Sequence, residues 1–265
     1  METETELSTG AGVIPILRAW DETASPLSHG FIGREGGVGA GPFASLNLSY
    51  WVGDDARAVD ANWKRLRGQV PELKLVARVN QVHGKIVHVV RREDLSLRPK
   101  ADGIVTAEPG LMIGIFTADC VPILMIDPKR KIAGALHAGW RGVLAGIVEN
   151  GVRAMTSLGA HIDDLRAATG PSIGPCCFEV DAALAERFAS EIEGSERHAR
   201  LGRPDKAYLD LRAIVKDQLL GAGLTGANIT AVGPCTRCAS DRFFSRRAAG
   251  GNITGLQMSF AGFPR

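Results

Sequence analysis

The sequence predicts an α/β fold in which mixed β-sheets are flanked by helices. Short apolar runs, typical of buried strands, come in clusters and do not alternate regularly with helices. Apolar residues at helical spacing recur in three separate stretches. Because the 265 residues contain no internal repeat, low-complexity run or obvious linker, we expect one domain over residues 13–265, after a flexible tail over residues 1–12.

Three of the four expected helices follow from clear apolar stripes, and the fourth, over residues 181–192, follows from a weaker one. Asp54–Asp55 can cap the first helix, and Asp210 is placed as the N-cap of the last. Gly159 and Gly223 stand where the second and the last stripe end. The expected helices cover residues 56–66, 144–158, 181–192 and 211–222.

Apolar or alternating runs between these helices predict the strands. Several of the runs are apolar on both faces, which suits central strands that are covered on both sides. The expected strands are Val13–Ala19, Leu75–Val79, Lys85–Val90, Gly103–Thr106, Leu111–Phe116, Val121–Ile126, Ile132–Leu136 and Ile229–Val232.

The charge balance and the hydropathy exclude several classes of partner. The 31 basic and 29 acidic side chains leave a net charge of +2, which provides no reason to expect nucleic acid or an anionic membrane as a partner. The longest apolar stretch, Leu111–Ile126, is interrupted by Thr117, Asp119 and Pro122 and falls short of the roughly 20 residues that span a bilayer. The polar, acidic N-terminus does not resemble a secretory signal. We therefore expect a cytoplasmic protein.

The five cysteines do not form a disulfide framework, because their number is odd and a chain of this length folds without such bonds. Cys176 and Cys177 are adjacent, and Cys235 and Cys238 form a Cys-x-x-Cys pair. No second pair has zinc-finger spacing, and no helix clearly begins after the pair as in a thioredoxin-like site. We interpret these four as structural cysteines. The alternative is a metal or redox role for Cys235 and Cys238, and a place in the lining of the pocket for Cys176 and Cys177.

Reactive side chains gather in three segments, each at the end of an expected strand or in the turn after it. From these segments His83, Cys120 and His137 offer two imidazoles and one thiolate, which zinc binds readily while keeping a fourth position open. The alternative is that the histidines are structural and Cys120 is a core thiol. The segments are Asn80–Gly84, Thr117–Cys120 and His137–Gly142.

These three residues lie in the strings QVHG, TADC and HAGWRG. In this order, the strings resemble the signature of the laccase-domain family. Members of that family are also described as multicopper polyphenol oxidases, peptidoglycan editing factors and purine nucleoside phosphorylases. The resemblance covers nearly the whole chain. Further segments that agree are His29–Leu48, Val52–Leu66, Ala101–Thr106, Gly170–Val180 and Cys235–Ser245.

This resemblance implies a catalytic metal, zinc in preference to copper, that is bound by His83, Cys120 and His137. The implied reaction is phosphorolysis of adenosine, inosine or methylthioadenosine, with deamination of adenosine as a side activity. The implied partners are a purine nucleoside and phosphate. The implied fold is an arrangement of mixed sheets similar to the catalytic domain of cytotoxic necrotizing factor toxins.

Two arginines are candidates for binding phosphate. Arg34 lies in the glycine-rich loop Gly33–Gly37, and an arginine can bind an anion in a bidentate manner. The loop is not a Walker loop, since no Gly-Lys-Ser/Thr follows. The resemblance points Arg34 into the active site as a catalytic and substrate-binding residue; the alternative is a solvated turn arginine. Arg141 opens the helix after His137, where an anion can bind, with a structural ion pair as the alternative.

Asp119, beside Cys120, is a third substrate-binding candidate that could also orient a ligand histidine, act as a general base or cap a turn. The chain departs from the family near its C-terminus. Relatives usually have Tyr-Arg-Arg after Phe-Phe-Ser and later Gly-Arg-Gln, whereas here Arg246 follows Ser245 and Leu256 stands in place of the later arginine. Substrate choice can therefore differ in this chain.

Other functions stay open on the sequence alone. A hydrolase that edits peptidoglycan precursors would use Cys120 as its nucleophile. Copper-dependent polyphenol oxidation requires several clustered copper sites, for which the six histidines are few. A binding module with a structural zinc would require a fourth ligand, and none is evident. The preferred nucleoside and the oligomeric state are also open.

Overall fold

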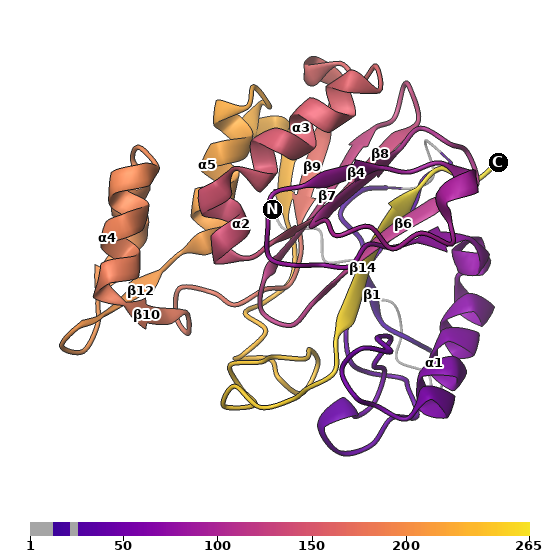
Figure 1. The fold of residues 1–265 in the computed structure, drawn as a ribbon, viewed down its shortest axis with the longest axis horizontal. Helices are drawn as coiled ribbons and strands as arrows, with labels where there is room; N and C mark the ends of the chain where they lie inside the picture. The colour runs from indigo at the N-terminus through magenta and orange to yellow at the C-terminus, as the bar shows by residue number, and fades with distance from the viewer. Residues whose placement is uncertain (1–12, 22–25) are drawn as a thin grey trace.

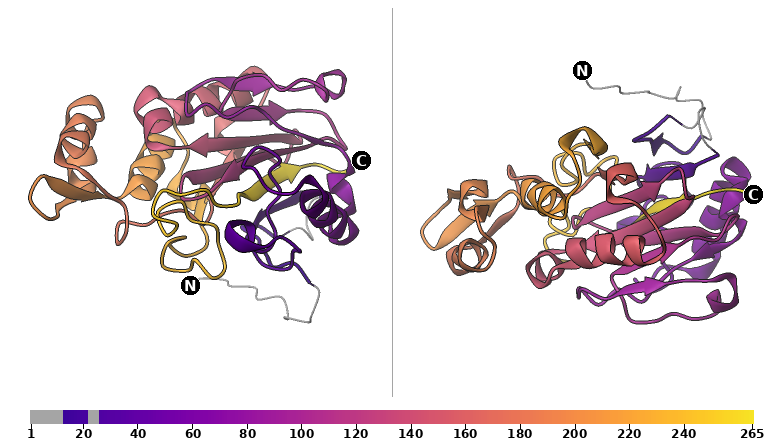
Figure 2. Two further views of the ribbon diagram at one scale, coloured as in Figure 1. Left: turned by 60° about the horizontal axis from the view of Figure 1, so that its bottom comes forward. Right: turned by 90° about the horizontal axis from the view of Figure 1, so that it is seen from above.

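Two mixed β-sheets pack face to face in the computed structural model, which describes residues 13–21 and 26–265 (Figure 1). Helices lie on the outer face of each sheet, as the two views in Figure 2 show. The predicted fold class of mixed sheets flanked by helices is confirmed. The expected tail over residues 1–12 lies outside the described residues, and the single-domain boundary stays a prediction.

The first sheet has five strands in the order β1-β2-β14-β6-β3. Its neighbouring strands are antiparallel except β3 and β6, which are parallel. Four of the strands, β2, β3, β6 and β14, are buried along their whole length. The strands are β1 (Ile16–Leu17), β2 (Ser28–Ile32), β3 (Val76–Ala77), β6 (Met112–Thr117) and β14 (Gln257–Gly262).

The second sheet has six strands in the order β13-β9-β7-β8-β5-β4, parallel at its two edges and antiparallel in its centre. The hairpin β7–β8 forms its middle, and Pro122 of β7 pairs with His137 of β8. This register brings the end of TADC beside the start of HAGWRG. The strands are β4 (Val87–Val89), β5 (Gly103–Thr106), β7 (Val121–Asp127), β8 (Ile132–Ala138), β9 (Arg166–Thr169) and β13 (Ile229–Ala231).

Three apolar layers hold the sheets and helices together. One lies between the two sheets, where Phe31, Ile113 and Leu124 are buried. A second lies between the five-stranded sheet and α1 (Ala56–Gln69), whose Trp63 is 2% exposed. The third joins the six-stranded sheet to α2 (Trp140–Ala145), α3 (Ile147–Ser157) and α5 (Leu211–Gly221). Short 3-10 turns cover Gly41–Phe43, Pro71–Lys74, Arg92–Asp94, Ile162–Asp164, Ser195–His198 and Gly226–Asn228.

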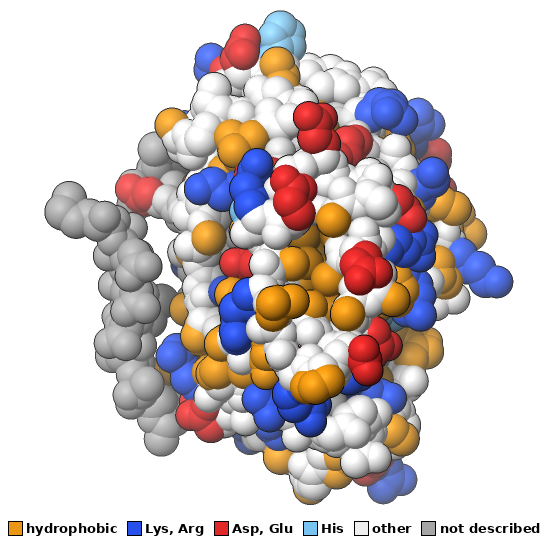
Figure 3. All heavy atoms as spheres, turned by 90° about the vertical axis from the view of Figure 1, so that its left-hand side faces the viewer, with side chains coloured by type: hydrophobic (Ala, Val, Ile, Leu, Met, Phe, Trp, Pro, Cys, Tyr) orange, Lys and Arg blue, Asp and Glu red, His pale blue; other side chains and the backbone are white. Residues whose placement is uncertain are grey.

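A small third sheet projects from one end of the molecule together with α4 (Ala182–Glu191) (Figure 1). Its order is β10-β12-β11, with both pairs antiparallel. The face that carries α4 mixes hydrophobic, basic and acidic side chains without a continuous basic band (Figure 3). Within residues 13–21 and 26–265, no helix has the length and apolar character that a membrane span requires. The strands are β10 (Glu179–Asp181), β11 (Ala199–Leu201) and β12 (Lys206–Leu209).

The structure corrects the expected helix over residues 144–158. Gly146 adopts a left-handed conformation with φ of 89°, which glycine tolerates and which separates α2 from α3. The caps at Asp55 and Asp210 are confirmed, because each side chain accepts a main-chain N–H of its helix.

The expected strands are present, although the run Val13–Ala19 pairs only at Ile16–Leu17. Six strands were missed, namely β2, β9, β10, β11, β12 and β14. Two of them, β2 (SHGFI) and β14 (QMSFAG), are entirely buried yet contain Ser, His, Gln and Gly. Such composition hides a central strand from any prediction based on hydrophobicity alone.

Candidate metal centre

The three predicted ligand residues lie together. One ligand atom of each of His83, Cys120 and His137 lies within 4.8 Å of the other two. The imidazole rings of His83 and His137 meet edge to face, with centroids 4.7 Å apart at 81°. Residues that are far apart in sequence therefore converge on one point, with two nitrogen donors and one sulfur donor.

Local backbone structure places each of these side chains. Cys120 directly precedes β7, and His137 lies near the end of β8 in the same hairpin. His83 lies in the loop between β3 and β4 with a φ of 60°, a conformation that non-glycine residues rarely adopt. Such backbone strain persists only where the surrounding contacts enforce it.

Asp102 supplies those contacts. Its buried carboxylate accepts the main-chain N–H groups of Val82, His83 and Gly84 at 3.2, 2.8 and 2.6 Å. The same carboxylate accepts a hydrogen bond from Nδ1 of His137 at 2.8 Å. With Nδ1 donating to Asp102, His137 has Nε2 free for a metal, as in carboxylate–histidine–zinc arrangements. One side chain thus positions two of the three candidate ligands.

The electrostatics of the centre favour a thiolate. Burial opposes ionisation of Cys120, but the charge and hydrogen bond of His137, together with the hydrogen bond of His83, lower the pKa of Cys120 to about 6. Burial disfavours the charged form of His137, whereas the Cys120 thiolate and Asp102 raise the pKa of His137 to about 9. A thiolate is the form in which cysteine binds a metal or attacks as a nucleophile.

Gly139, the glycine of HAGWRG, leaves room for the cluster. A Cβ atom at this position would lie 3.1 Å from Sγ of Cys120 and 3.1 Å from Cδ2 of His83. A larger residue would therefore press on two candidate ligands at once. Three features make the site fit zinc. They are donor atoms within 4.8 Å of one another, a His₂Cys donor set, and the carboxylate of Asp102 behind His137.

Asp119 has both carboxylate oxygens engaged by the C-terminal part of the chain. Oδ1 accepts the hydroxyl of Thr236 at 2.6 Å, and Oδ2 accepts the main-chain N–H of Arg247 at 2.7 Å. The carboxylate that bonds Nδ1 of the candidate ligand His137 is that of Asp102. The contact of Asp119 with substrate stays a prediction.

Arg34 is half-buried and anchored, which differs from the solvated turn arginine of the alternative interpretation. Its Nε donates to the carbonyl of Ala44 at 2.6 Å and its Nη1 to that of Ser240 at 2.7 Å. The guanidinium lies over the ring of Phe244, 4.7 Å from its centroid. Burial lowers the pKa of Arg34, with Asp241 opposing that shift. Its roles in catalysis and substrate binding stay predictions.

Arg141 is exposed and stacks on the ring of Trp140 at 4.1 Å. The alternative of a structural ion pair is not supported, since the described part of the chain holds no acidic partner within ion-pair distance of Arg141. Its phosphate contact stays a prediction. Of the altered C-terminal positions, Arg246 is exposed, and the main-chain N–H of Leu256 donates to Oδ1 of Asn47 at 3.0 Å.

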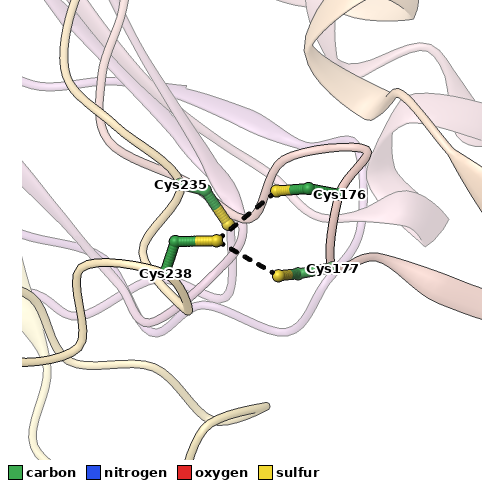
Figure 4. Close-up of side chains that lie close together, drawn as sticks. All are labelled: Cys176, Cys177, Cys235 and Cys238. Atoms are coloured by element: carbon green, nitrogen blue, oxygen red, sulfur yellow. Dashed lines mark hydrogen bonds between the residues drawn. The ribbon is translucent and has the colours of Figure 1, made fainter.

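A second group of potential metal ligands was not predicted. The four cysteines that the sequence suggested were separate structural residues have their Sγ atoms within 4.8 Å of one another. They come from the loop before β10 and the loop after β13 and point toward one another (Figure 4). The sequence does not reveal this arrangement, because Cys177 and Cys235 are 58 positions apart in the chain.

Several known proteins resemble this chain. A purine nucleoside phosphorylase of Mycobacterium tuberculosis is 39% identical over 216 residues, which cover 81% of this chain and 84% of that protein. The purine nucleoside phosphorylase YlmD of Geobacillus stearothermophilus is 34% identical over 261 residues, covering 92% and 94%. The adenosine deaminase RL5 of an unknown prokaryotic organism is 36% identical over 224 residues, covering 81% and 86%.

Solved structures agree with these sequence relationships. The crystal structure of YlmD from Geobacillus stearothermophilus superimposes with a TM-score of 0.88 at 33% identity, over 94% of this chain and 96% of that one. The YfiH protein of Bacillus licheniformis has a TM-score of 0.84 at 30% identity, over 89% and 92%. Residues 28–264 match the family model described as multi-copper polyphenol oxidoreductase laccase. Since that match spans nearly the whole chain, this protein belongs to the laccase-like family that the model defines.

Proposed function

We propose that this chain is a zinc-dependent purine nucleoside phosphorylase that also deaminates adenosine. The observation that carries the proposal is the convergence of His83, Cys120 and His137, with Asp102 behind His137. Relatives at 34% to 39% identity are named purine nucleoside phosphorylases, and one at 36% is named an adenosine deaminase. Zinc bound by these three residues would supply a Lewis acid with an open coordination position.

The chain's own residues would prepare this site before substrate arrives. Asp102 fixes the tautomer of His137 and holds the loop of His83, so that the donor atoms need little rearrangement. The low pKa of Cys120, about 6, keeps its sulfur in the thiolate form at neutral pH. Both features reduce the reorganisation that binding and reaction require.

Phosphorolysis requires an anion site next to the reacting carbon. A phosphate oxygen attacks the anomeric carbon, the bond from that carbon to the purine nitrogen breaks, and the base leaves after taking up a proton. We assign phosphate binding to Arg34 and Arg141, which present guanidinium groups suited to bidentate contact. Arg141 is exposed and would make the first contact with an incoming phosphate. Arg34 is anchored by two main-chain carbonyls and would hold the bound phosphate in place.

Deamination would act on adenosine bound at the same site. Water adds to the C6 carbon of adenine and ammonia leaves, so that adenosine becomes inosine. This reaction requires no phosphate, which separates it experimentally from phosphorolysis.

Hydrolytic editing of peptidoglycan precursors is the second candidate, and one observation favours it. Cys120 is flanked by two histidines and has a low pKa, as an activated thiol nucleophile would. A thiolate that is shared with a metal is not free to attack a carbonyl. Metal occupancy of the centre formed by His83, Cys120 and His137 therefore separates the two candidates.

Copper-dependent polyphenol oxidation has less support despite the family's name. Among the residues that the structure describes, only two groups contain three or more potential metal ligands. One group holds two histidines and the other holds none. The remaining histidines, which belong to neither group, are His29, His88, His161 and His198.

The deciding experiment incubates the zinc-loaded protein with adenosine, with and without phosphate, and separates the products by chromatography. Adenine and ribose 1-phosphate that form only with phosphate would support phosphorolysis, and inosine in both reactions would support deamination. His137→Ala should lose both activities, whereas the matched control His161→Ala, an exposed histidine outside the cluster, should keep them. Absence of turnover with adenosine, inosine and methylthioadenosine would rule out the proposal and favour precursor editing.

A further inference from the structure

Outside the candidate active site, the described residues contain one more group of three or more potential metal ligands. We call it the four-cysteine cluster. Its members are Cys176, Cys177, Cys235 and Cys238 (Figure 4). We infer that this cluster is a second metal site, which binds one zinc ion through four thiolates and holds the C-terminal loop next to the active centre.

The sulfur positions fit a single ion. Sγ of Cys238 lies 3.6 Å from that of Cys176 and 3.4 Å from that of Cys177, and all four lie within 4.8 Å of one another. Zinc–sulfur bonds of about 2.3 Å in tetrahedral geometry place the sulfurs about 3.8 Å apart. A [4Fe–4S] cluster binds each cysteine to a different iron and a [2Fe–2S] cluster binds them as two pairs on two irons, so either would spread the four sulfurs further. The spacing therefore favours a mononuclear site.

Core packing does not account for the cluster. Cys176 and Cys238 are exposed, Cys235 is half-buried, and none of the cysteines is in a disulfide. Cysteine that serves as a small hydrophobic residue is normally buried. Exposed thiols this close together are open to oxidation, and a bound ion would protect them.

The backbone brings the two pairs of cysteines together without the ion. The main-chain N–H of Thr236 donates to the carbonyl of Ser172 at 3.0 Å, and Ser172 and Cys235 form an isolated parallel bridge. A turn that begins at Gly174, whose carbonyl accepts the N–H of Cys177 at 2.9 Å, presents the other pair. The ligand atoms are thus close before binding, which lowers the entropy cost of forming a site.

The surroundings suit negative sulfur atoms. The main-chain N–H of Gly174 donates to Sγ of Cys235 at 3.2 Å, and Nη1 of Arg237 donates to Sγ of Cys177 at 3.4 Å. Arg212 donates to the carbonyls of Ser172 and Pro234 beside the cluster. Four thiolates on one divalent ion carry a net charge of −2, and these arginines offset it.

The cluster also has a position from which it affects the active centre. Thr236, inside the Cys-x-x-Cys pair, donates its hydroxyl to Asp119, which directly precedes Cys120. A bound ion would hold Thr236 and the following loop in place, and β10 begins two residues after Cys177. The site therefore joins the active-centre loop to the base of the projecting small sheet.

Metal analysis of the purified full-length protein, expressed with added zinc, tests the inference. We expect two zinc ions per chain, one in the double variant Cys235→Ser/Cys238→Ser, and one in the double variant His83→Ala/His137→Ala. A zinc content that is the same in the cysteine variant as in the unaltered protein would contradict the site, whatever the occupancy of the active centre. No nucleoside is involved, so this result is independent of whether phosphorolysis is observed.

X-ray absorption at the zinc edge covers the case in which the cysteine variant does not fold. In His83→Ala/His137→Ala, the remaining zinc should have four sulfur neighbours at about 2.3 Å. Nitrogen or oxygen neighbours would overturn the inference. So would two alkyl groups fewer per chain when the freshly purified protein is denatured, stripped of metal and alkylated without prior reduction than when it is reduced first, since that difference indicates a disulfide within the cluster.

Discussion

Asp102 and His137 form a buried pair in which Nδ1 of the histidine donates to Oδ1 of the carboxylate at 2.8 Å. The main-chain N–H of His137 also donates to the carbonyl of Asp102 at 2.7 Å, because β5 and β8 are neighbouring strands. The histidine is therefore held at both its backbone and its ring. Because Nδ1 is occupied by Asp102, Nε2 is the ring nitrogen that remains available to bind a metal.

The pair predicts a specific effect of Asp102→Asn on metal binding. The amide is neutral, so it weakens the hydrogen bond that fixes the His137 tautomer. It also weakens the contacts with the loop of His83. We expect the zinc affinity of the active centre to fall about 10-fold to 100-fold, as for other residues that support a metal ligand. Competition with a chromophoric chelator measures this affinity.

The matched control is Asp163→Asn, which makes the same chemical change at an exposed aspartate in the 3-10 turn Ile162–Asp164, away from the cluster. It should bind zinc as the unaltered chain does. Equal zinc affinities for Asp102→Asn and the unaltered chain would show that Asp102 does not support the ligand.

Gly139→Ala tests whether the small residue in HAGWRG serves the ligands. Gly139 has φ of −76° and ψ of 161°, which alanine adopts without strain. The added methyl group would nevertheless contact Cys120 and His83 at 3.1 Å. We expect weaker zinc binding and a lower rate of nucleoside turnover. The melting temperature of the metal-free protein should change little.

Gly68→Ala is the control for this substitution. Gly68 lies in α1, and a methyl group added there would meet no atom within 4 Å. Alanine at this position should therefore stabilise the helix by up to about 1 kcal/mol and leave zinc binding intact. Normal zinc affinity in Gly139→Ala would remove the steric explanation for this glycine.

The three ligand candidates could be predicted because each stands at a strand end or in the loop after a strand and belongs to a segment rich in reactive side chains. The register of the β7–β8 hairpin then brings Cys120 and His137 together. Asp102 was harder to single out, although the segment Ala101–Thr106 was part of the resemblance. A lone aspartate at the start of a strand has many possible roles, and only the pairing of β5 with β8 places it behind His137.

The four-cysteine cluster could not be predicted from spacing. Its two halves are separated by α4, the small sheet and α5, and they meet only because β13 runs parallel to β9. Pairing at that edge places Ser172 beside Cys235. Motif spacing reports ligands that are close in sequence, whereas this cluster depends on a contact between distant strands.

Arg34→Lys tests the assignment of phosphate binding. Lysine keeps the charge but cannot reproduce the hydrogen bonds to both Ala44 and Ser240 that orient the guanidinium. A charge-assisted hydrogen bond contributes about 1.5–3 kcal/mol, so the KM for phosphate should rise about 10-fold or more. The KM for the nucleoside should change less.

Arg65→Lys is the control, since Arg65 is exposed and donates to the carbonyl of Gly36 in the same loop. Initial rates at varied phosphate and at varied adenosine give both constants. Equal increases in the two KM values for Arg34→Lys would indicate a general disturbance of the loop and contradict a phosphate-specific role.

Asp127, at the end of β7, should make the free energy of unfolding of the protein depend on pH. The carboxylate is fully buried and accepts the main-chain N–H groups of Lys129, Arg130 and His161 and the guanidinium of Arg130. Burial opposes its ionisation, but the hydrogen bonds from Arg130 and His161 outweigh that effect and lower the pKa of Asp127. The folded state therefore favours the ionised carboxylate.

A carboxyl group whose pKa is lower in the folded state stabilises the protein above its unfolded pKa of about 3.9, and this stabilisation is lost as the pH falls through the folded pKa. Asp127→Asn should lower the free energy of unfolding by about 2–3 kcal/mol at pH 7, because it removes charged hydrogen bonds. The difference from the unaltered chain should shrink below about pH 4, where Asp127 itself becomes neutral. Urea unfolding at a series of pH values measures it. A difference that stays constant down to about pH 2 would mean that the charge of Asp127 contributes nothing and that the asparagine acts through packing alone.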